Sequence, residues 1–285
     1  MSEFNVLSLG AGVQSTALYL KFQRGEMPLK LDAAIFADTQ DEPADVYRHL
    51  DWLRSLGGPP ILTGTAGKLS EDLIHCRNST GGRFASIPAF TTADAGATIG
   101  IVRRQCSKEY KTDVIGKVLR REVLGLQPGR TAAKGVKVNQ FIGISLDEAG
   151  RAARMQRNVP APKYIERHFH LIEQNETRAD CLNYLADKVP HQTPRSACKF
   201  CPYHNDYEWN KQKTEAPEEF AESVKVDSSL RANGSVVNRQ LDQVLYLHRS
   251  CKPLDLVQFD PTPPKPRDVQ LQMNFAAECE GMCGV

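Results

Sequence analysis

The chain has 285 residues, of which 41% are hydrophobic and 25% are charged, and its formal net charge is +2. A chain of this length can bury a substantial core, and no run approaches the roughly 18 apolar residues that a membrane helix needs. Residues 1–4 do not begin a secretory signal, so we expect a cytoplasmic protein with no membrane partner. The near-neutral charge neither requires nor excludes nucleic acid, because such binding depends on how charges cluster.

Apolar runs alternate with helical patterns along most of the chain. Strands are predicted at residues 4–7, 31–37, 61–62, 138–144 and 168–172. Helices are predicted between them, over residues 17–24, 43–56, 70–77, 106–124 and 147–155, and from residue 177 onward. This alternation predicts an α/β fold, with a mainly parallel twisted sheet and helices on both of its faces.

Two further stretches do not follow this alternation. Residues 78–100 are rich in Gly, Ser, Thr and Ala and are predicted to form a long loop, either a functional lid or a disordered segment. Residues 206–249 have a helical pattern, and the proline-rich tail 253–285 is expected to wrap over the domain. We therefore predict a nucleotide-binding domain over residues 1–205 and a helical and irregular extension over residues 206–285, packed on the same domain.

The sequence Leu-Gly-Ala-Gly-Val-Gln-Ser-Thr at residues 9–16 joins the first strand to the first helix. Gly10 and Gly12 let backbone N–H groups approach an anion, while Ser15 and Thr16 add hydroxyl donors at a helix N-terminus. The loop has neither the lysine of a Walker A motif nor the third glycine of the dinucleotide fingerprint. We interpret it as a phosphate cradle, and the alternative is a structural turn that binds nothing.

Two other residues are predicted to lie beside this loop. Asp38 ends the second strand, and Gly143 ends the strand predicted over residues 138–144. Open α/β sheets bind ligands at the carboxyl ends of their strands. Asp38 is thus a candidate to bind a nucleotide or a metal ion, or it caps the next helix. The backbone at Gly143 is suited to contact adenine or ribose.

Five segments, in this order, resemble the PP-loop ATP pyrophosphatase superfamily, in its phosphoadenosine phosphosulfate reductase-like branch: residues 9–16, 36–43, 104–111, 143–148 and 171–181. The resemblance implies an adenine nucleotide α-hydrolase-like fold that binds ATP with Mg²⁺. The nucleotide-binding residues that it implies are Gly10, Ala11, Gly12, Gln14, Ser15, Thr16, Asp38, Arg104 and Gly143. The usual loop of the family, SGGxDS, has aspartate where this chain has Gln14, which leaves the binding of magnesium open.

The eight cysteines fall into groups with different settings. Cys76 and Cys181 lie in helical patterns and are interpreted as buried thiols. Cys106 stands at a predicted helix start, where the helix dipole favours a thiolate. Cys198 and Cys201 form a Cys-x-x-Cys motif, whose thiolates can bind one metal centre. Disulfides are not expected in a reducing compartment.

The resemblance implies that Cys106, Cys198 and Cys201 hold a [4Fe-4S] cluster. A zinc site with the same ligands is the alternative, and His204 could be a ligand of either metal. The fourth ligand could be Cys283, Cys279, Cys251 or none. The segment 278–284 resembles the Glu-Cys-Gly end of sulfonucleotide reductases, in which a tail cysteine attacks the substrate, so Cys279 is also a catalytic candidate.

Basic residues complete the predicted site. Arg104 and Lys111 flank Cys106, and Arg151 and Arg154 follow Gly143 at helical spacing. Guanidinium groups in these places could clamp phosphates or a polynucleotide backbone, although solvated helix faces often have the same pattern. Lys111 joins Asp38 and Cys279 as a catalytic candidate.

The favoured hypothesis is an adenylating sulfurtransferase. ATP would adenylate an acceptor on a nucleic-acid base or backbone with release of pyrophosphate, and sulfur would displace AMP with the iron–sulfur cluster taking part. The alternatives are a sulfonucleotide reductase that uses Cys279 and a nucleotide-binding protein with a structural metal. Partners compatible with the favoured hypothesis are a nucleotide, a nucleic-acid substrate, a sulfur-donor protein and a second copy of the chain.

Overall fold

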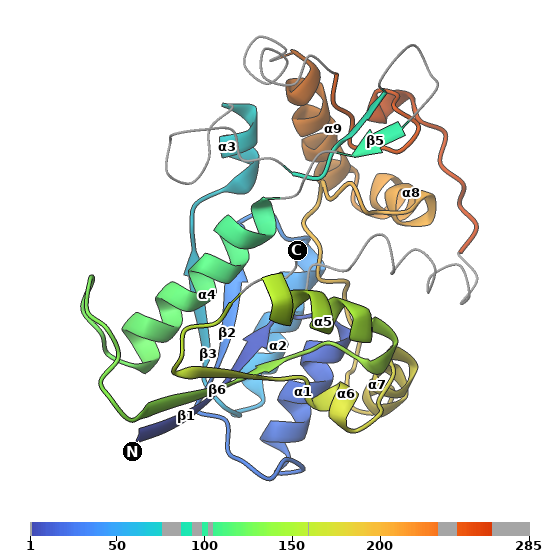
Figure 1. Ribbon diagram of the computed structural model, residues 1–285. Helices are drawn as coiled ribbons and strands as arrows, with labels where there is room; N and C mark the ends of the chain where they lie inside the picture. The colour runs from blue at the N-terminus through green and yellow to red at the C-terminus, as the bar shows by residue number, and fades with distance from the viewer. Residues whose placement is uncertain are drawn as a thin grey trace.

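A five-stranded parallel sheet forms the centre of the computed structural model, which describes residues 2–75, 87–92, 99–101, 105–158, 160–232 and 244–263 (Figure 1). Its strands are β1 (Ser2–Leu9), β2 (Ala33–Asp38), β3 (Ile61–Thr65), β6 (Val136–Ile142) and β7 (Ile165–His168). They lie in the order β3-β2-β1-β6-β7, and every neighbouring pair is parallel. The predicted α/β fold with a mainly parallel sheet is confirmed.

Helices cover both faces of the sheet, because buried apolar side chains project from its strands alternately to one face and to the other. Leu7 and Leu9 of β1 point to one face, where they pack with α1 (Val13–Gln23), α2 (Ala44–Ser55) and α7 (Arg178–Leu185). Val6 points to the other face, toward α4 (Asp113–Val118) and α5 (Ala149–Asn158). Successive side chains of a strand alternate between faces, so an uninterrupted apolar run indicates a strand that is buried on both.

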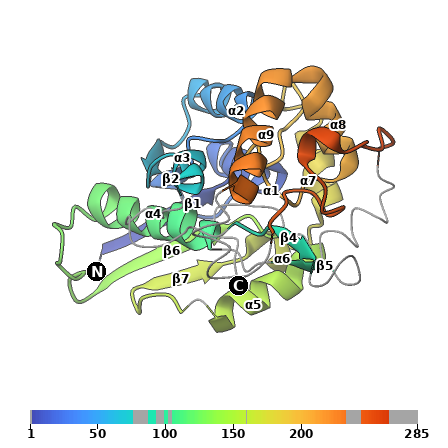
Figure 2. The ribbon, with the colours of Figure 1, turned by 90° about the horizontal axis from the view of Figure 1, so that it is seen from above.

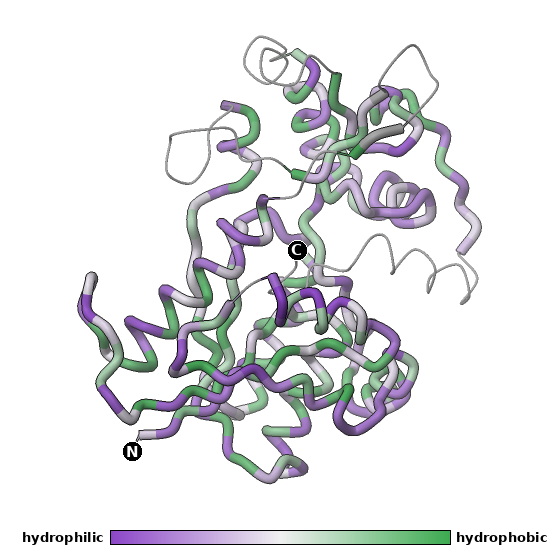
Figure 3. The backbone as a smooth tube through the Cα atoms, in the orientation of Figure 1, coloured by the Kyte–Doolittle hydropathy of each residue, from purple (hydrophilic) through white to green (hydrophobic). Residues whose placement is uncertain are grey.

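The helix expected over residues 106–124 is one continuous element with wide turns at both ends. It consists of the π-helical η1 (Ser107–Thr112), α4 and the π-helical η2 (Leu119–Val123). The Leu124 N–H donates to the Leu119 carbonyl, five residues back, at 3.0 Å. Figure 3 shows hydrophobic and hydrophilic stretches alternating along the element, as expected for a helix with one face on a sheet.

A third apolar cluster lies beyond the sheet and contains the C-terminal helices. Trp209 of α8 (Asp206–Glu215) is fully buried there with side chains of α3 (Leu69–Ile74), α9 (Pro217–Ala232) and η4 (Leu254–Leu256). Figure 2 shows α9 beside α2 and α3, and the backbone N–H of Ala44 donates to Glu219 of α9 at 2.8 Å. Packing of this kind places the helices against the sheet domain, while the division at residue 205 stays a prediction.

The strand predicted at residues 168–172 is wrong in position. The structure has β7 over Ile165–His168 and, directly after it, α6 (His170–Glu173). Phe169 and Leu171 pack on different apolar clusters, so the apolar run spans a turn of helix rather than a strand face. The β6 register explains the shift, because Phe141, next to the end of that strand, already pairs with His168.

Two stretches also depart from their predicted structure. Within the predicted loop 78–100 and just beyond it, β4 (Phe90–Thr92) and β5 (Ile99–Ile101) form an antiparallel pair. Residues 244–249, predicted to be helical, instead run beside β4, where Phe90 and Tyr246 exchange two backbone hydrogen bonds of 2.8 Å. At residues 244–249, hydrogen bonding to β4, which is distant in sequence, overrides the local helical pattern.

Candidate nucleotide site

The loops after β1 and β6 lie side by side at the carboxyl edge of the sheet. From β1 the chain continues to β2 on one side, whereas β6 pairs with the opposite edge of β1, so the two loops flank the point where the strand order reverses. Ligands of open α/β sheets bind at this point. The two loops touch at Gly143, where an added Cβ would lie 2.7 Å from the backbone nitrogen of Ser15. Only a glycine permits this approach.

The loop after β1 leaves the N-terminus of α1 without a side-chain cap. Ala11 adopts a left-handed conformation with φ of 58°, and the N-cap residue Gly12 is extended. The Ser15 hydroxyl accepts from the Gly10 N–H at 3.2 Å and donates to the Gly12 carbonyl at 3.3 Å, which braces the turn from inside. The first turn of α1 contains no acidic residue. The first N–H groups of a helix have no intrahelical partner, so here they can bind an anion.

Gln14 is buried in a polar network beneath the loop. Its Nε2 donates to Glu148 Oε2 at 2.9 Å, and its Oε1 accepts from Arg178 Nη1 at 2.8 Å. Glu148, in η3 (Leu146–Glu148), also pairs with Arg151 at 2.7 Å. The side chain of Gln14 therefore binds the protein, and its backbone is the part that can meet a ligand. An aspartate at this position would set a second carboxylate near that of Glu148.

Thr16 makes its side-chain hydrogen bond to α2. Its Oγ1 lies 2.9 Å from Nε2 of His49, and both residues are fully buried. Burial, together with the neighbouring His191, lowers the pKa of His49 to about 4, so its imidazole is neutral at neutral pH. Sequence reasoning missed His49, because a histidine inside a helical pattern gives no signal of its contact with the loop.

Asp38 lies at the carboxyl end of β2, one strand away from the loop. Its Oδ1 accepts from the Gln40 N–H at 2.7 Å and from the Tyr47 hydroxyl at 2.8 Å. Burial and the hydrogen bond to Asp38 raise the pKa of Tyr47, which keeps its phenol protonated as the donor. Both bonds end on the same oxygen, so Oδ2 is the atom that can take a ligand. Asp38 does not cap α2, whose N-cap residue is Pro43.

Lys111 is held at the same edge by a buried carboxylate. Its Nζ lies 3.1 Å from Oε1 of Glu42, and the two side chains are 6% and 1% exposed. Thr39 Oγ1 donates to the same carboxylate oxygen at 3.1 Å. The wide turns of η1 carry Lys111, and such π-helical segments are frequent at functional sites. Glu42 was within a segment of the family resemblance but was not singled out from the sequence.

Three of the predicted metal ligands share one apolar cluster. Cys198 and Cys201 are buried in it, and the Cys201 N–H donates to the Cys198 carbonyl at 3.0 Å. Cys106, at the start of η1, packs against the same cluster. Within the part of the chain that the structure describes, no group of three or more His, Cys, Asp or Glu side chains is arranged to hold a metal ion. The donors suit a thiolate-bound metal, and the site stays a prediction.

The remaining candidates are placed as follows. Cys181 is buried in α7. The rings of His204 and Trp209 form a T-shaped pair, with centroids 4.8 Å apart. Burial raises the pKa of the Cys251 thiol. Cys76, Arg104, Cys279 and Cys283 lie outside the described residues.

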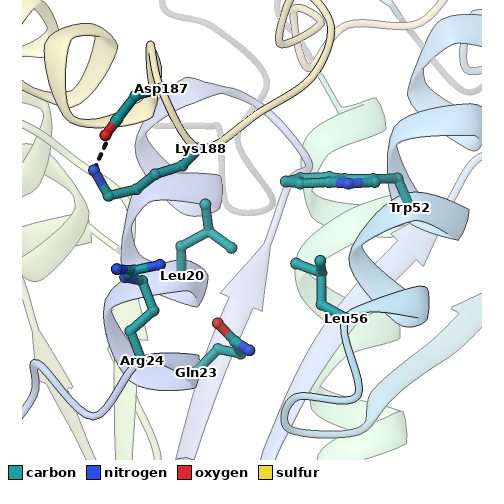
Figure 4. A pocket seen from close by; sticks show the side chains of 7 residues that line it. All are labelled: Leu20, Gln23, Arg24, Trp52, Leu56, Asp187 and Lys188. Carbon is teal, nitrogen blue, oxygen red and sulfur yellow. Dashed lines mark hydrogen bonds and ion pairs between the residues drawn. The ribbon is translucent and has the colours of Figure 1, made fainter.

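A surface hollow of about 350 Å³ lies at the far end of α1 from the loop. Figure 4 shows Trp52 facing Leu20 across it, with the ion pair of Asp187 and Lys188 on its rim. Its lining comes from the last turns of α1 and α2 and from the segment after α7. The hollow is therefore separate from the candidate nucleotide site at the strand ends.

Fold and site together define an α/β protein with a glycine-containing loop and an uncapped helix N-terminus at the switch point of a parallel sheet. No protein-family model matches the chain, and no curated protein matches it. Among solved structures, the chain is similar to U34-tRNA thiolase NcsA from Methanococcus maripaludis with its [4Fe-4S] cluster. The identity is 15%, the match covers 92% of this chain and 84% of that chain, and the TM-score is 0.35. None of the described helices is long and apolar enough to span a membrane.

Proposed function

We propose that the chain binds ATP at the loop of residues 9–16 and adenylates an acceptor on a nucleic-acid base or backbone. The observation that carries this proposal is the contact of Gly143 with the first turn of α1. It sets an uncapped helix N-terminus at the switch point of the sheet, where backbone donors can bind a polyphosphate. The family resemblance of the loop supports ATP as that ligand.

The proposed reaction has two steps. An acceptor oxygen attacks the α-phosphorus of ATP, the bond from that phosphorus to the bridging oxygen breaks, and pyrophosphate leaves. A sulfur nucleophile then attacks the activated carbon, and AMP leaves with the acceptor oxygen. Fixed N–H donors at the start of α1 stabilise charge on the departing pyrophosphate. Asp38 Oδ2 is proposed to hold Mg²⁺ or the ribose, and Lys111 to contact phosphate at the end of β2.

The thiols of Cys106, Cys198 and Cys201 are proposed to hold a [4Fe-4S] cluster, with zinc as the alternative metal. When bound, the cluster would supply a soft metal site for sulfur. The three residues approach one apolar cluster from the start of η1 and from the turn before α8. Burial among apolar side chains would keep water away from such a centre.

The test is a comparison of ATP affinity in two double variants. Ser15→Ala with Thr16→Ala removes both hydroxyls of the loop and should weaken ATP binding by about 100-fold, since hydrogen bonds to charged groups contribute about 1.5–3 kcal/mol each. Thr214→Ala with Ser229→Ala removes two hydroxyls that donate to carbonyls of their own helices, α8 and α9, and should leave affinity unchanged. Calorimetric titration measures both, with unfolding in urea as the check of the fold.

Two results would contradict the proposal. Unchanged ATP affinity in the loop variant rules out the phosphate cradle. Consumption of adenylyl sulfate without release of pyrophosphate from ATP rules out adenylation. That result would support the alternative hypothesis, a sulfonucleotide reductase. Adenylation is supported if the wild-type protein releases pyrophosphate from ATP in the presence of RNA and the loop variant does not.

A further inference from the structure

A chain of hydrogen bonds leads from the nucleotide loop to the protein surface. Thr16 Oγ1 lies 2.9 Å from His49 Nε2, and His49 Nδ1 lies 2.9 Å from Nε2 of His191. Thr16 and His49 are fully buried, whereas His191 is exposed. The three residues come from α1, α2 and the segment after α7, so the chain joins three elements on one face of the sheet.

Packing fixes the orientation of the buried imidazole. The Trp52 ring lies 5.3 Å from that of His49 at an interplanar angle of 31°, and it meets His191 edge-on at 5.4 Å. The rings of the two histidines are nearly perpendicular, at 83°. With its plane held in this way, His49 presents one nitrogen to Thr16 and the other to His191.

A neutral imidazole has one donor and one acceptor nitrogen, so the hydrogen bonds that link Thr16, His49 and His191 can be donated in either of two directions. In the first, the Thr16 hydroxyl donates to His49 Nε2, and His49 Nδ1–H donates to His191. In the second, His191 Nε2–H donates to His49 Nδ1, and His49 Nε2–H donates to Thr16. Both imidazoles remain neutral with one proton each in either direction, and exchange with solvent at His191 interconverts the tautomers. Only the second direction leaves the Thr16 proton available to another acceptor.

We propose that His49 is a positioning residue that donates Nε2–H to Thr16 and so turns the Thr16 hydroxyl proton toward a phosphate of the bound nucleotide. His191 selects this tautomer by donating to His49 from the surface. A bound phosphate favours the second direction because it accepts the Thr16 proton in a charge-assisted hydrogen bond. This inference rests on the proposed function, since it assigns a role within the ATP site.

Two amide substitutions at His49 distinguish the positioning role from a role in packing alone. His49→Gln places an amide near the Nε2 position, where it can still donate to Thr16. His49→Asn carries the same group only as far as the Nδ1 position, where it can bond His191 but not Thr16. We expect the Gln variant to bind ATP within about 3-fold of wild type and the Asn variant to bind it about 10-fold more weakly. Equal affinities in the two variants would overturn the proposal.

A second variant keeps the test decisive if His49→Asn does not fold. Thr16→Val removes the hydroxyl and keeps the shape of the side chain, so its ATP affinity should also fall by about 10-fold. Unchanged affinity in Thr16→Val would overturn the role of the hydroxyl. If the wild-type protein itself does not bind ATP, the proposed function fails and this inference fails with it. If wild type binds ATP and the variants do not differ, only the positioning role is wrong.

The tautomer itself can be observed by ¹⁵N NMR of the histidine side chains in the full chain. Addition of ATP should move His49 to the form protonated at Nε2, and inorganic pyrophosphate should do the same because the phosphate is the proposed acceptor. A structural role for His49 predicts no such change. A His49 ring protonated at Nδ1 in the ATP-saturated protein would overturn the proposal.

Discussion

Glu148 gives a physical reason for the glutamine at position 14. The PP-loop pattern that this loop resembles has aspartate here, and from the sequence alone the difference appears only as one negative charge fewer. In the structure, the Gln14 amide connects Glu148 with Arg178, so it bridges an anion and a cation that are distant in sequence. A carboxylate here would oppose Glu148 in a buried setting, which is unfavourable.

Replacing Glu148 tests how far this network supports the loop. Glu148→Gln keeps the shape but removes the carboxylate that pairs with the buried Arg151, so the free energy of unfolding should fall by about 3 kcal/mol. Glu166→Gln is the matched control, because Glu166 pairs with Lys137 on the surface and its loss should leave the free energy of unfolding close to that of wild type. Urea unfolding of both variants gives the comparison. Similar losses in the two would show that the buried network does not stabilise the fold.

A glycine follows β6 and another lies in the middle of α4, and the two differ in the space available for a side chain. A Cβ at Gly143 would collide with backbone of the loop at 2.7 Å, whereas a Cβ at Gly116 in α4 has open space around it. The Gly143 contact is between backbones, so no side-chain rotation can relieve a collision. At Gly116 an added side chain would meet no collision, so the glycine there only adds the entropic cost of ordering a glycine in a helix.

Alanine substitutions at these glycines should therefore have opposite signs. Gly143→Ala should lower the free energy of unfolding by about 2 kcal/mol and weaken ATP binding, because β6 and the loop must separate. Gly116→Ala should raise stability by about 0.5–1 kcal/mol through helix propensity and leave ATP binding unchanged. Thermal unfolding and calorimetric titration measure the two effects. Normal affinity in Gly143→Ala would mean that the contact does not shape the cradle.

The sequence predicts an element well when the residues that determine it lie within the element itself. Strand β2 and helix α2 follow from an apolar run and from a proline at a helix start, and both lie within a few residues of their predicted bounds. The α6 turn and the Phe90 contact with Tyr246 were missed, because pairing with distant segments decides them. For the site, the glycines and strand ends could be found from the sequence. Glu42, Glu148 and His49 could not, since their partners are known only from the folded chain.

Buried histidines make the stability of the whole protein depend on pH. Burial lowers the pKa values of His49, His170 and His248 below the ordinary value of 6.5, and that of His49 to about 4. The unfolded chain therefore binds more protons than the folded chain once the pH falls below about 6.5. Their stabilising contribution is complete above that pH and is lost as the pH falls toward 4.

We expect the free energy of unfolding to fall by about 2 kcal/mol between pH 7 and pH 5, mainly through His49. Urea unfolding at intervals of half a pH unit measures the slope. The His49→Gln variant should show a shallower slope over the same range, because its side chain does not titrate. A wild-type stability that is constant from pH 7 to pH 5 would contradict the buried neutral state of these imidazoles.

The central strand of the sheet is synthesised long before one of its two neighbours. Residues 2–8 of β1 pair with residues 136–142 of β6, so one edge of β1 has no partner until roughly half the chain has been made. An uncovered apolar strand can pair with other chains. The loop after β1 also lacks its Gly143 neighbour during this time. A nascent chain that ends before β6 is thus prone to aggregate, and its candidate phosphate-binding loop is incomplete until β6 emerges.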